Sequence, residues 1–323
     1  MKYIIGAYAT APSLGLNDQR IEKEYYQNLI KFVPAVRGFE IPFWGNDIHI
    51  YGTEFLLNFI NSEWQNVLTC IPGTVMGLKS DLHFGLASDN EDGRIAAINM
   101  HKKAHQKLKE INRVFNKNVF IAVQIATSPS VSISGVSSSI SSLMRSLVEI
   151  LSWNWMGAKI VIEHCDAFTG DLSFEKGFMN LNDEIEVLQF FSKNHDVGMT
   201  INWARSAIEG KSAETVIEHI RKVKKSHLLT GMMFSGTTDI NAEYGAWKDT
   251  HMPIAQKGMA WSNSLLTEQQ MEETILNISL DQIDYVGIKF SLMPLASKSI
   301  DARVNINKNG ILSLNSVIRP LCV

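Results

Sequence analysis

The stretch KIVIEHCDA, residues 159–167, reads as a buried β-strand that ends in ionisable side chains. Its first part, Lys159–Glu163, is mostly apolar and β-branched without polar alternation, which is typical of a strand covered on both faces in a parallel sheet. Glu163, His164 and Asp166 lie at its carboxyl end. Because burying an unpaired charge is costly, we expect these groups to meet one another, water or a ligand.

Similar apolar runs recur along the chain, and segments with helical periodicity separate them. The expected strands are Tyr3–Ala9, Val36–Pro42, Asn66–Ile71, Val119–Ala126, Lys159–Glu163, Val197–Asn202, Leu228–Phe234 and Tyr285–Phe290. The expected helices are Asp18–Phe32, Gly93–Phe115, Leu143–Trp153, Asp183–Ser192, Ala213–Lys225 and Thr267–Leu280. Strands and helices in alternation predict an α/β protein with a closed (β/α)8 TIM barrel. An open doubly wound sheet is less favoured because no GxGxxG motif follows the first strand.

The length and composition fit one such barrel. The chain has 323 residues, of which 45% are hydrophobic and 20% charged, and no repeat or Pro/Gly-rich linker divides it. We therefore predict a single TIM-barrel domain, residues 1–323, with a C-terminal extension from about residue 296 to 323. A Ser-rich segment, Ser128–Ser142, is expected to be a loop that caps the following helix.

Charge and cysteine usage narrow the class of partner. A formal net charge of -3 argues against a nucleic-acid partner or an anionic membrane surface, both of which require a basic footprint. No apolar stretch has the length of a membrane span. The three cysteines, Cys70, Cys165 and Cys322, match neither a disulfide framework nor a metal knuckle. We expect a cytoplasmic protein whose partner is a small molecule.

Polar residues at the strand ends point to the expected pocket, because the active site of a TIM barrel lies at the carboxyl ends of its strands. Successive side chains of a strand point to opposite faces, so Glu163 and His164 cannot both point into the barrel. We predict that Glu163 points inward, and that His164 packs against other side chains or holds a site residue in place. Asp166 lies beyond the strand, and two roles are left open for it: a member of the site, or a side chain that caps a turn of its own loop. The other strand-end candidates are Glu40, Gln124, Asn202, Arg205 and Lys289.

Two further features belong to loops beside these strand ends. Asp249 and His251 have DxH spacing, which suits metal ligation or a carboxylate that orients an imidazole. Trp203 lies between Asn202 and Arg205 and is the tryptophan best placed to stack on a sugar ring.

Together these residues resemble the xylose-isomerase-like TIM barrels, the superfamily of sugar and sugar-phosphate isomerases and epimerases, and suggest an uncharacterised bacterial branch of it. VIEHC resembles the context of the family's metal-binding Glu at Glu163, and DTHMPI resembles a family DxH loop at Asp249 and His251. NWAR has the spacing of the family's D-x-x-H motif with Asn202 and Arg205 in its place.

The resemblance also implies what this chain lacks. The family's final strand usually supplies a Glu where this chain has Lys289. A divalent ion would find few ligands here, because Asn202, Arg205 and Lys289 stand where the family has ligand side chains. The positive charges of Arg205 and Lys289 would also repel it. We therefore expect no metal among the site residues and no cofactor, with a divalent Mg, Mn or Zn ion left open. Members of the superfamily are often oligomers, so a homo-oligomer is left open too.

The leading hypothesis is a sugar, sugar-acid or sugar-phosphate isomerase or epimerase. Glu163 would abstract a proton next to a carbonyl, Lys289 or Arg205 would replace the metal as electrophile, and His251 completes the catalytic set. Glu40, Gln124, Asn202, Trp203, Arg205 and Asp249 are the expected substrate-binding residues. The alternatives are a Schiff-base lyase or aldolase at Lys289, a glycosidase using Glu40 and Glu163, and a non-catalytic sugar-binding protein.

Overall fold

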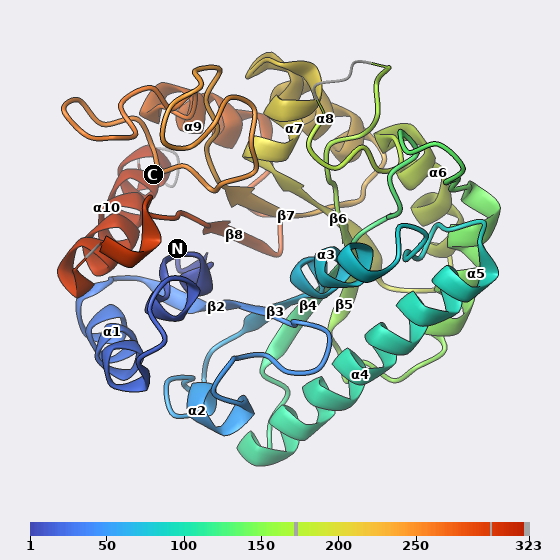
Figure 1. The fold of residues 1–323 in the computed structure, drawn as a ribbon, viewed down its shortest axis with the longest axis horizontal. Helices are drawn as coiled ribbons and strands as arrows, with labels where there is room; N and C mark the ends of the chain where they lie inside the picture. Colours follow the sequence, from blue (N-terminus) through green and yellow to red (C-terminus); the bar gives the residue numbers. More distant parts are fainter. Residues whose placement is uncertain (171–173, 298, 320–323) are drawn as a thin grey trace. The chain divides into compact units, whose positions relative to one another are not determined.

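The computed structural model describes residues 1–170, 174–297 and 299–319. Its strands are β1 (Tyr3–Ile5), β2 (Val36–Pro42), β3 (Asn66–Thr69), β4 (Phe120–Ile125), β5 (Lys159–Glu163), β6 (Val197–Asn202), β7 (Leu229–Phe234) and β8 (Tyr285–Ile288). They close in chain order into a barrel, and the strands that pair do so in parallel (Figure 1). The predicted (β/α)8 TIM barrel is confirmed.

Helices separate the strands. They are α1 (Gln19–Phe32), α2 (Thr53–Leu57), α3 (Ile71–Ser80), α4 (Glu91–Phe115), α5 (Ile140–Leu151), α6 (Leu181–Phe191), α7 (Trp203–Gly210), α8 (Glu214–Lys225), α9 (Glu268–Asn277) and α10 (Ile300–Ile318). Side chains at the start of several helices accept a backbone N–H, as Asp18 does for α1 and Ser139 does for α5. The predicted capping role of the Ser-rich segment is confirmed at Ser139. None of the helices in the described ranges has the length and apolar character needed to cross a bilayer.

The first strand is shorter than the predicted Tyr3–Ala9. β1 ends at Ile5, and Ala7–Thr10 forms a 3-10 turn. The backbone N–H of Gly6 still donates to the carbonyl of Ile288, at 2.8 Å. The apolar composition of residues 7–11 arises because this turn is buried, and not because it continues the strand.

The chain folds into two compact units, each assembled from segments that are distant in the sequence. Unit 1 comprises Met1–Glu40, Ile201–Arg221 and Gly231–Val323, and unit 2 comprises Ile41–Thr200 and Lys222–Thr230. In unit 1, β1 pairs with β2 and β8, β7 pairs with β8, and α10 packs against α1 and α9. In unit 2, β3 to β6 pair in succession, and α5 packs against α4 and α6.

The segment expected to be a C-terminal extension contains α10. Arg303 of this helix is fully buried, and its guanidinium donates to the carbonyl oxygens of Thr10 and Leu295. α10 is therefore an integral helix of unit 1. Cys322 lies outside the described residues, whereas Cys70 and Cys165 are buried free thiols.

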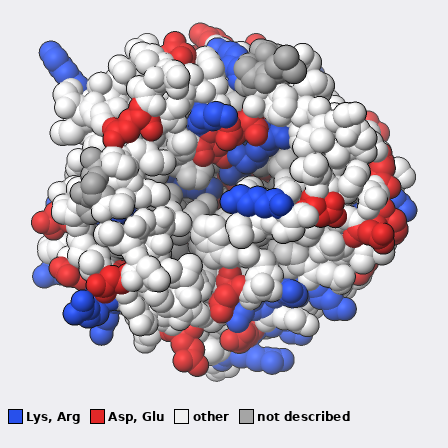
Figure 2. Space-filling model, viewed as in Figure 1, with Lys and Arg blue, Asp and Glu red and all other residues white. Residues whose placement is uncertain are grey.

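Acidic and basic side chains are interspersed on the face drawn in Figure 2, and no extended area of that face carries one sign.

Candidate functional site

In unit 1, a salt bridge joins the ends of β2 and β8. The register places Ile5 beside both Phe39 and Ile288, so the next residues along the three chains are Gly6, Glu40 and Lys289. The Lys289 Nζ lies 2.8 Å from the Glu40 Oε2, and both side chains are 0% exposed. Buried charges of opposite sign are tolerated when they pair in this way.

Gly6 makes room for this salt bridge. A Cβ atom at Gly6 would lie 2.8 Å from the Lys289 Cγ, which is closer than side-chain carbons approach. The Lys289 Nζ also lies 5.7 Å from the ring centroid of Tyr8, within range of a cation–π interaction. The 3-10 turn that follows β1 therefore helps to hold the ammonium group in place.

A second cluster in unit 1 links α7 to the loop after β7. The Asn202 Oδ1 accepts the backbone N–H of Arg205, at 3.5 Å, and so caps the start of α7. From the first turn of this helix, the Arg205 Nε donates to the Asp249 Oδ2 at 3.0 Å. The Asp249 Oδ1 in turn lies 3.2 Å from the His251 Nδ1. Asp249 therefore bridges a guanidinium and an imidazole.

His251 is the most accessible member of this cluster. Its side chain is 17% exposed, compared with 5% for Asp249. Its Nδ1 also lies 3.1 Å from the Ser235 Oγ. A carboxylate can only accept a hydrogen bond, whereas the Ser235 hydroxyl can donate or accept one, so the tautomer of His251 depends on which of these two partners Nδ1 takes.

The surroundings favour the neutral imidazole. Burial lowers the pKa of His251 below its usual value, and the positive charges of Lys289 and Arg205 act in the same direction, while Asp249 opposes them. The result is a histidine oriented by a carboxylate and held in its basic form, which is the state that proton abstraction requires.

Unit 2 contains a row of buried polar side chains across its strands. The register sets Thr69 beside Gln124, Gln124 beside Val161, and Glu163 beside Thr200. Because registered neighbours and alternate residues share a face, these polar groups lie on one face of the sheet. Gln124 and Glu163 are therefore brought to the same face of β4 and β5.

His164 shows which face that is. Its Nδ1 lies 2.7 Å from the Glu184 Oε2 of α6, and the Thr127 Oγ1 donates to the other oxygen of Glu184 at 2.6 Å. His164 thus points toward the helix layer, and Glu163 lies on the opposite face, as strand alternation predicts. The supporting role expected for His164 is confirmed by this contact with Glu184.

Other expected roles change with the structure. Trp203 is fully buried at the start of α7, so its ring presents no face to a sugar, and the expected stacking role is wrong. The Asp166 Oδ2 accepts the backbone N–H groups of Glu175 and Lys176, both at 2.8 Å, so Asp166 braces its own loop. The roles of Gln124, Glu163 and Asn202 in substrate binding or catalysis stay predictions.

Ser235, Gly6 and Tyr8 were missed by the reading of the sequence. Ser235 directly follows β7, so the rule that strand ends carry the site would have found it. Gly6 and Tyr8 fell within an overlong predicted strand, and only the register shows that they adjoin Lys289.

The clusters of unit 1 do not fit a divalent ion. Such an ion needs several oxygen or imidazole ligands, but Glu40 is paired with Lys289 and Asp249 with Arg205. Elsewhere in unit 1, the Glu209 Oε1 and the His219 Nε2 lie 3.4 Å apart, and both groups are of the kind that binds metals. Glu209 and His219 belong to a group of three His and Glu side chains that could hold a metal ion.

The sequence matches a known family over most of its length. A family model described as a domain of unknown function, DUF4862, matches residues 4–306. The chain belongs to this family. An uncharacterized protein of Salmonella typhimurium is 35% identical to this DUF4862 chain over 317 residues, which cover 98% of each sequence.

Solved structures share the fold of this DUF4862 chain. One is the IolI protein with a bound zinc atom, with a TM-score of 0.60, 12% identity, and 98% of this chain and 99% of that chain covered. Another is D-psicose 3-epimerase in the presence of D-fructose, with a TM-score of 0.58, 11% identity and the same coverage. The predicted resemblance to the xylose-isomerase-like barrels is confirmed for the fold.

Proposed function

We propose that this DUF4862 chain is an isomerase or epimerase that moves a proton next to the carbonyl group of a sugar, sugar acid or sugar phosphate. The observation that supports the proposal is the Arg205–Asp249–His251 chain of contacts, in which a carboxylate held by Arg205 lies 3.2 Å from the Nδ1 of an imidazole whose neutral form is favoured. Sugar isomerases and epimerases among the structures with this fold support the same class of reaction.

In this mechanism, His251 takes the proton from the carbon next to the carbonyl. The electron pair of the broken C–H bond forms the C=C bond of an enolate, and the carbonyl oxygen becomes negative. Asp249 stabilises the imidazolium, and the positive charges of Lys289 and Arg205 favour the developing negative charge. When the hydroxyl proton of the first carbon moves to the enolate oxygen and the carbon-bound proton returns to the former carbonyl carbon, the product is an isomer. Return of the proton to the opposite face of the first carbon, with the carbonyl re-formed in place, gives an epimer.

Glu163 is the residue that the sequence predicts to abstract the proton, and its role as an acid or base stays a prediction. It is a fully buried carboxylate on the face of β5 opposite α6. As an acid or base of the reaction, Glu163 would be required for proton exchange, and as a packing group it would be dispensable. The variant Glu163→Gln separates these two cases.

The Glu40–Lys289 salt bridge weighs against two alternatives. A Schiff base requires a neutral amine, but a carboxylate 2.8 Å from the Nζ stabilises the charged ammonium group. A glycosidase that uses Glu40 requires a carboxylate free to act as acid or nucleophile, and Glu40 is engaged by Lys289. A non-catalytic sugar-binding protein is separated from our proposal by the assay below.

The test is proton exchange in deuterated water, followed by NMR. Purified protein is incubated with a panel of aldoses, ketoses, uronic acids and sugar phosphates. We expect deuterium next to the carbonyl of one class, and loss of exchange in His251→Asn. The control is His105→Asn, which changes a half-buried histidine of α4 in unit 2. Binding without exchange for every sugar, or exchange that persists in His251→Asn, would refute the proposal.

A further inference from the structure

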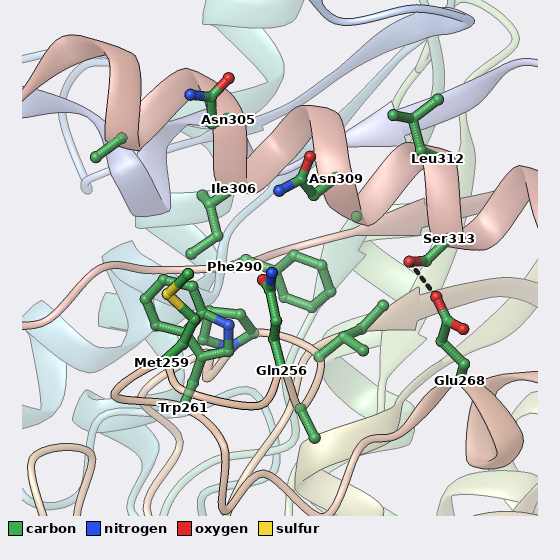
Figure 3. A pocket seen from close by; sticks show the side chains of 15 residues that line it. Gln256, Met259, Trp261, Glu268, Phe290, Asn305, Ile306, Asn309, Leu312 and Ser313 are labelled. Atoms are coloured by element: carbon green, nitrogen blue, oxygen red, sulfur yellow. Dashed lines mark hydrogen bonds between the residues drawn. The ribbon is translucent and has the colours of Figure 1, made fainter.

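A groove lies beside α10, outside the clusters described above. It has a volume of about 810 Å³, and all of its lining residues belong to unit 1. Figure 3 shows Gln256, Met259 and Trp261 on one side of it, α10 with Asn309 and Leu312 on the other, and Phe290 between them. A volume of roughly 300–1,000 Å³ is typical of small-molecule sites.

Phe290 separates this groove from the salt bridge. It follows Lys289 directly in the chain, and it lines the groove while Lys289 contacts Glu40. α10 approaches the ring closely because residue 310 is glycine: a Cβ atom there would lie 2.5 Å from the Phe290 Cε2. The floor of the groove is therefore a packed aromatic ring.

The groove combines apolar surface with amide groups. Trp261 is half-buried, and Met259 and Leu312 are exposed by 43% and 47%. Asn305 and Asn309 lie one turn apart on the exposed side of α10, and Gln256 is exposed across from them. Amide side chains both donate and accept hydrogen bonds, as sugar hydroxyls do.

The groove offers no positive charge to a ligand. Among its described lining residues there is no Lys or Arg, and the one acid, Glu268, accepts a hydrogen bond from the Ser313 Oγ at 2.7 Å. A phosphate or carboxylate ligand needs a cationic partner. The groove therefore suits an uncharged ligand with an apolar face and a polar edge.

We propose that this groove binds a neutral carbohydrate of about disaccharide size. A pyranose ring stacks on the half-buried indole of Trp261, and its hydroxyl groups exchange hydrogen bonds with Gln256 and Asn309. The inference goes beyond the proposed function and does not depend on it, because none of these residues takes part in the proton transfer.

The experiment is calorimetry and saturation-transfer NMR on the full chain with cellobiose, maltose and lactose, and with glucuronate and glucose 6-phosphate as charged comparisons. We expect saturable, millimolar binding of at least one neutral disaccharide, weakened about tenfold or more by Trp261→Ala. Trp261→Phe keeps a ring and should retain part of the affinity. Gln256→Ala, at an exposed loop position, should weaken binding without disturbing folding.

The matched control is Phe190→Ala. Phe190 is 55% exposed in another groove, formed by residues of unit 2, so its loss should leave the affinity unchanged. The proposal is overturned if no neutral disaccharide binds, if Trp261→Ala and Gln256→Ala bind as the parent does, or if the charged sugars bind better. Affinity lost in His251→Asn but kept in Trp261→Ala would assign the sugar to the proton-transfer site instead.

Discussion

Two histidine–carboxylate pairs in this protein have similar chemistry and different surroundings. In unit 2, His164 contacts Glu184 at 2.7 Å, and both side chains are 0% exposed. In unit 1, His251 contacts Asp249 at 3.2 Å, with 17% of the imidazole exposed. The first pair joins the end of β5 to α6, and the second lies in a loop where the imidazole is partly exposed.

The difference shows that a carboxylate beside an imidazole does not by itself indicate catalysis. Both carboxylate oxygens of Glu184 have a partner within the protein, His164 for one and Thr127 for the other. Asp249 is anchored by Arg205, and His251 has a partly exposed side chain and a lowered pKa. Accessibility and the charges around the pair, more than the pair itself, mark a proton-transfer group.

The largest expected effect is on activity and should separate the two pairs. We predict that His251→Asn lowers the rate of proton exchange by about 10²–10⁴-fold with little change in Tm, because it removes the acid–base group. His164→Asn should leave the rate per folded molecule within a few-fold of the parent. Equal losses in the two variants, measured by NMR exchange and thermal unfolding, would erase the distinction.

The converse prediction concerns stability. His164→Leu should lower the free energy of unfolding by about 3–5 kcal/mol, because it leaves the buried Glu184 without its imidazole partner. The double variant His164→Leu with Glu184→Leu removes both groups and should recover part of the loss. Urea unfolding measures both. A single variant as stable as the parent would show that the pair is not needed for folding.

A third histidine sharpens the contrast because its partner is a backbone carbonyl oxygen. The Nδ1 of His101, in α4, lies 2.8 Å from the carbonyl oxygen of Ala97, and burial lowers the pKa of the ring to about 4. In the unfolded chain the imidazole of His101 is protonated near pH 6.5, whereas in the folded protein it is protonated only near pH 4. The contribution of neutral His101 to the free energy of unfolding is therefore fully present above pH 6.5 and is lost as the pH drops toward 4. The loss should reach about 3 kcal/mol.

His101→Phe removes this titration. Urea unfolding at a series of pH values should show a shallower acid slope in the variant than in the parent. The same slope in both proteins would assign the acid sensitivity to other groups.

A smaller effect is expected at Gly6, which adjoins the salt bridge of unit 1. Gly6→Ala should destabilise the fold by about 1–3 kcal/mol, because the added methyl group overlaps Lys289 and forces it to shift. The backbone of Gly6, with φ of -75°, suits alanine, so the effect is steric. Proton exchange should slow as Lys289 is displaced. An unchanged Tm and rate would show that Lys289 tolerates the shift.

The smallest effect is on the pH profile. Because the pKa of His251 is lowered, its basic form persists below pH 6.5, and the acid limb of the exchange rate should lie below that value. A limb above pH 6.5 would mean that the negative charge of Asp249 outweighs burial and the nearby cations.

Much of the barrel could be read from the sequence because its strands obey a local rule. Lys159–Glu163, Val36–Pro42 and Val197–Asn202 were predicted with the bounds that the structure shows. A continuous apolar run indicates a strand of a parallel sheet, because such a strand is covered on both faces. The rule failed at residues 7–11, where a buried turn has the same apolar composition as a strand.

The candidate site was readable in part. Glu40, Arg205, Asp249, His251 and Lys289 were all candidates, and the structure arranges them in two clusters of unit 1. Trp203 was misjudged because a tryptophan beside polar residues has the same local sequence whether its ring is buried or open. The polar neighbours of a tryptophan in the chain do not show whether its ring is buried, because burial depends on residues that are distant in sequence.

The sequence by itself determined the order of strands and helices, the faces on which Glu163 and His164 lie, and the residue types available at the strand ends. Only the tertiary structure decided that Lys289 pairs with Glu40, that Arg205 anchors Asp249, and that the side chain of His251 stays partly exposed. The physical reason is that alternation and helical periodicity are local properties of the backbone. A salt bridge or a pKa shift instead depends on the register that brings distant residues together and on the solvent which that packing excludes.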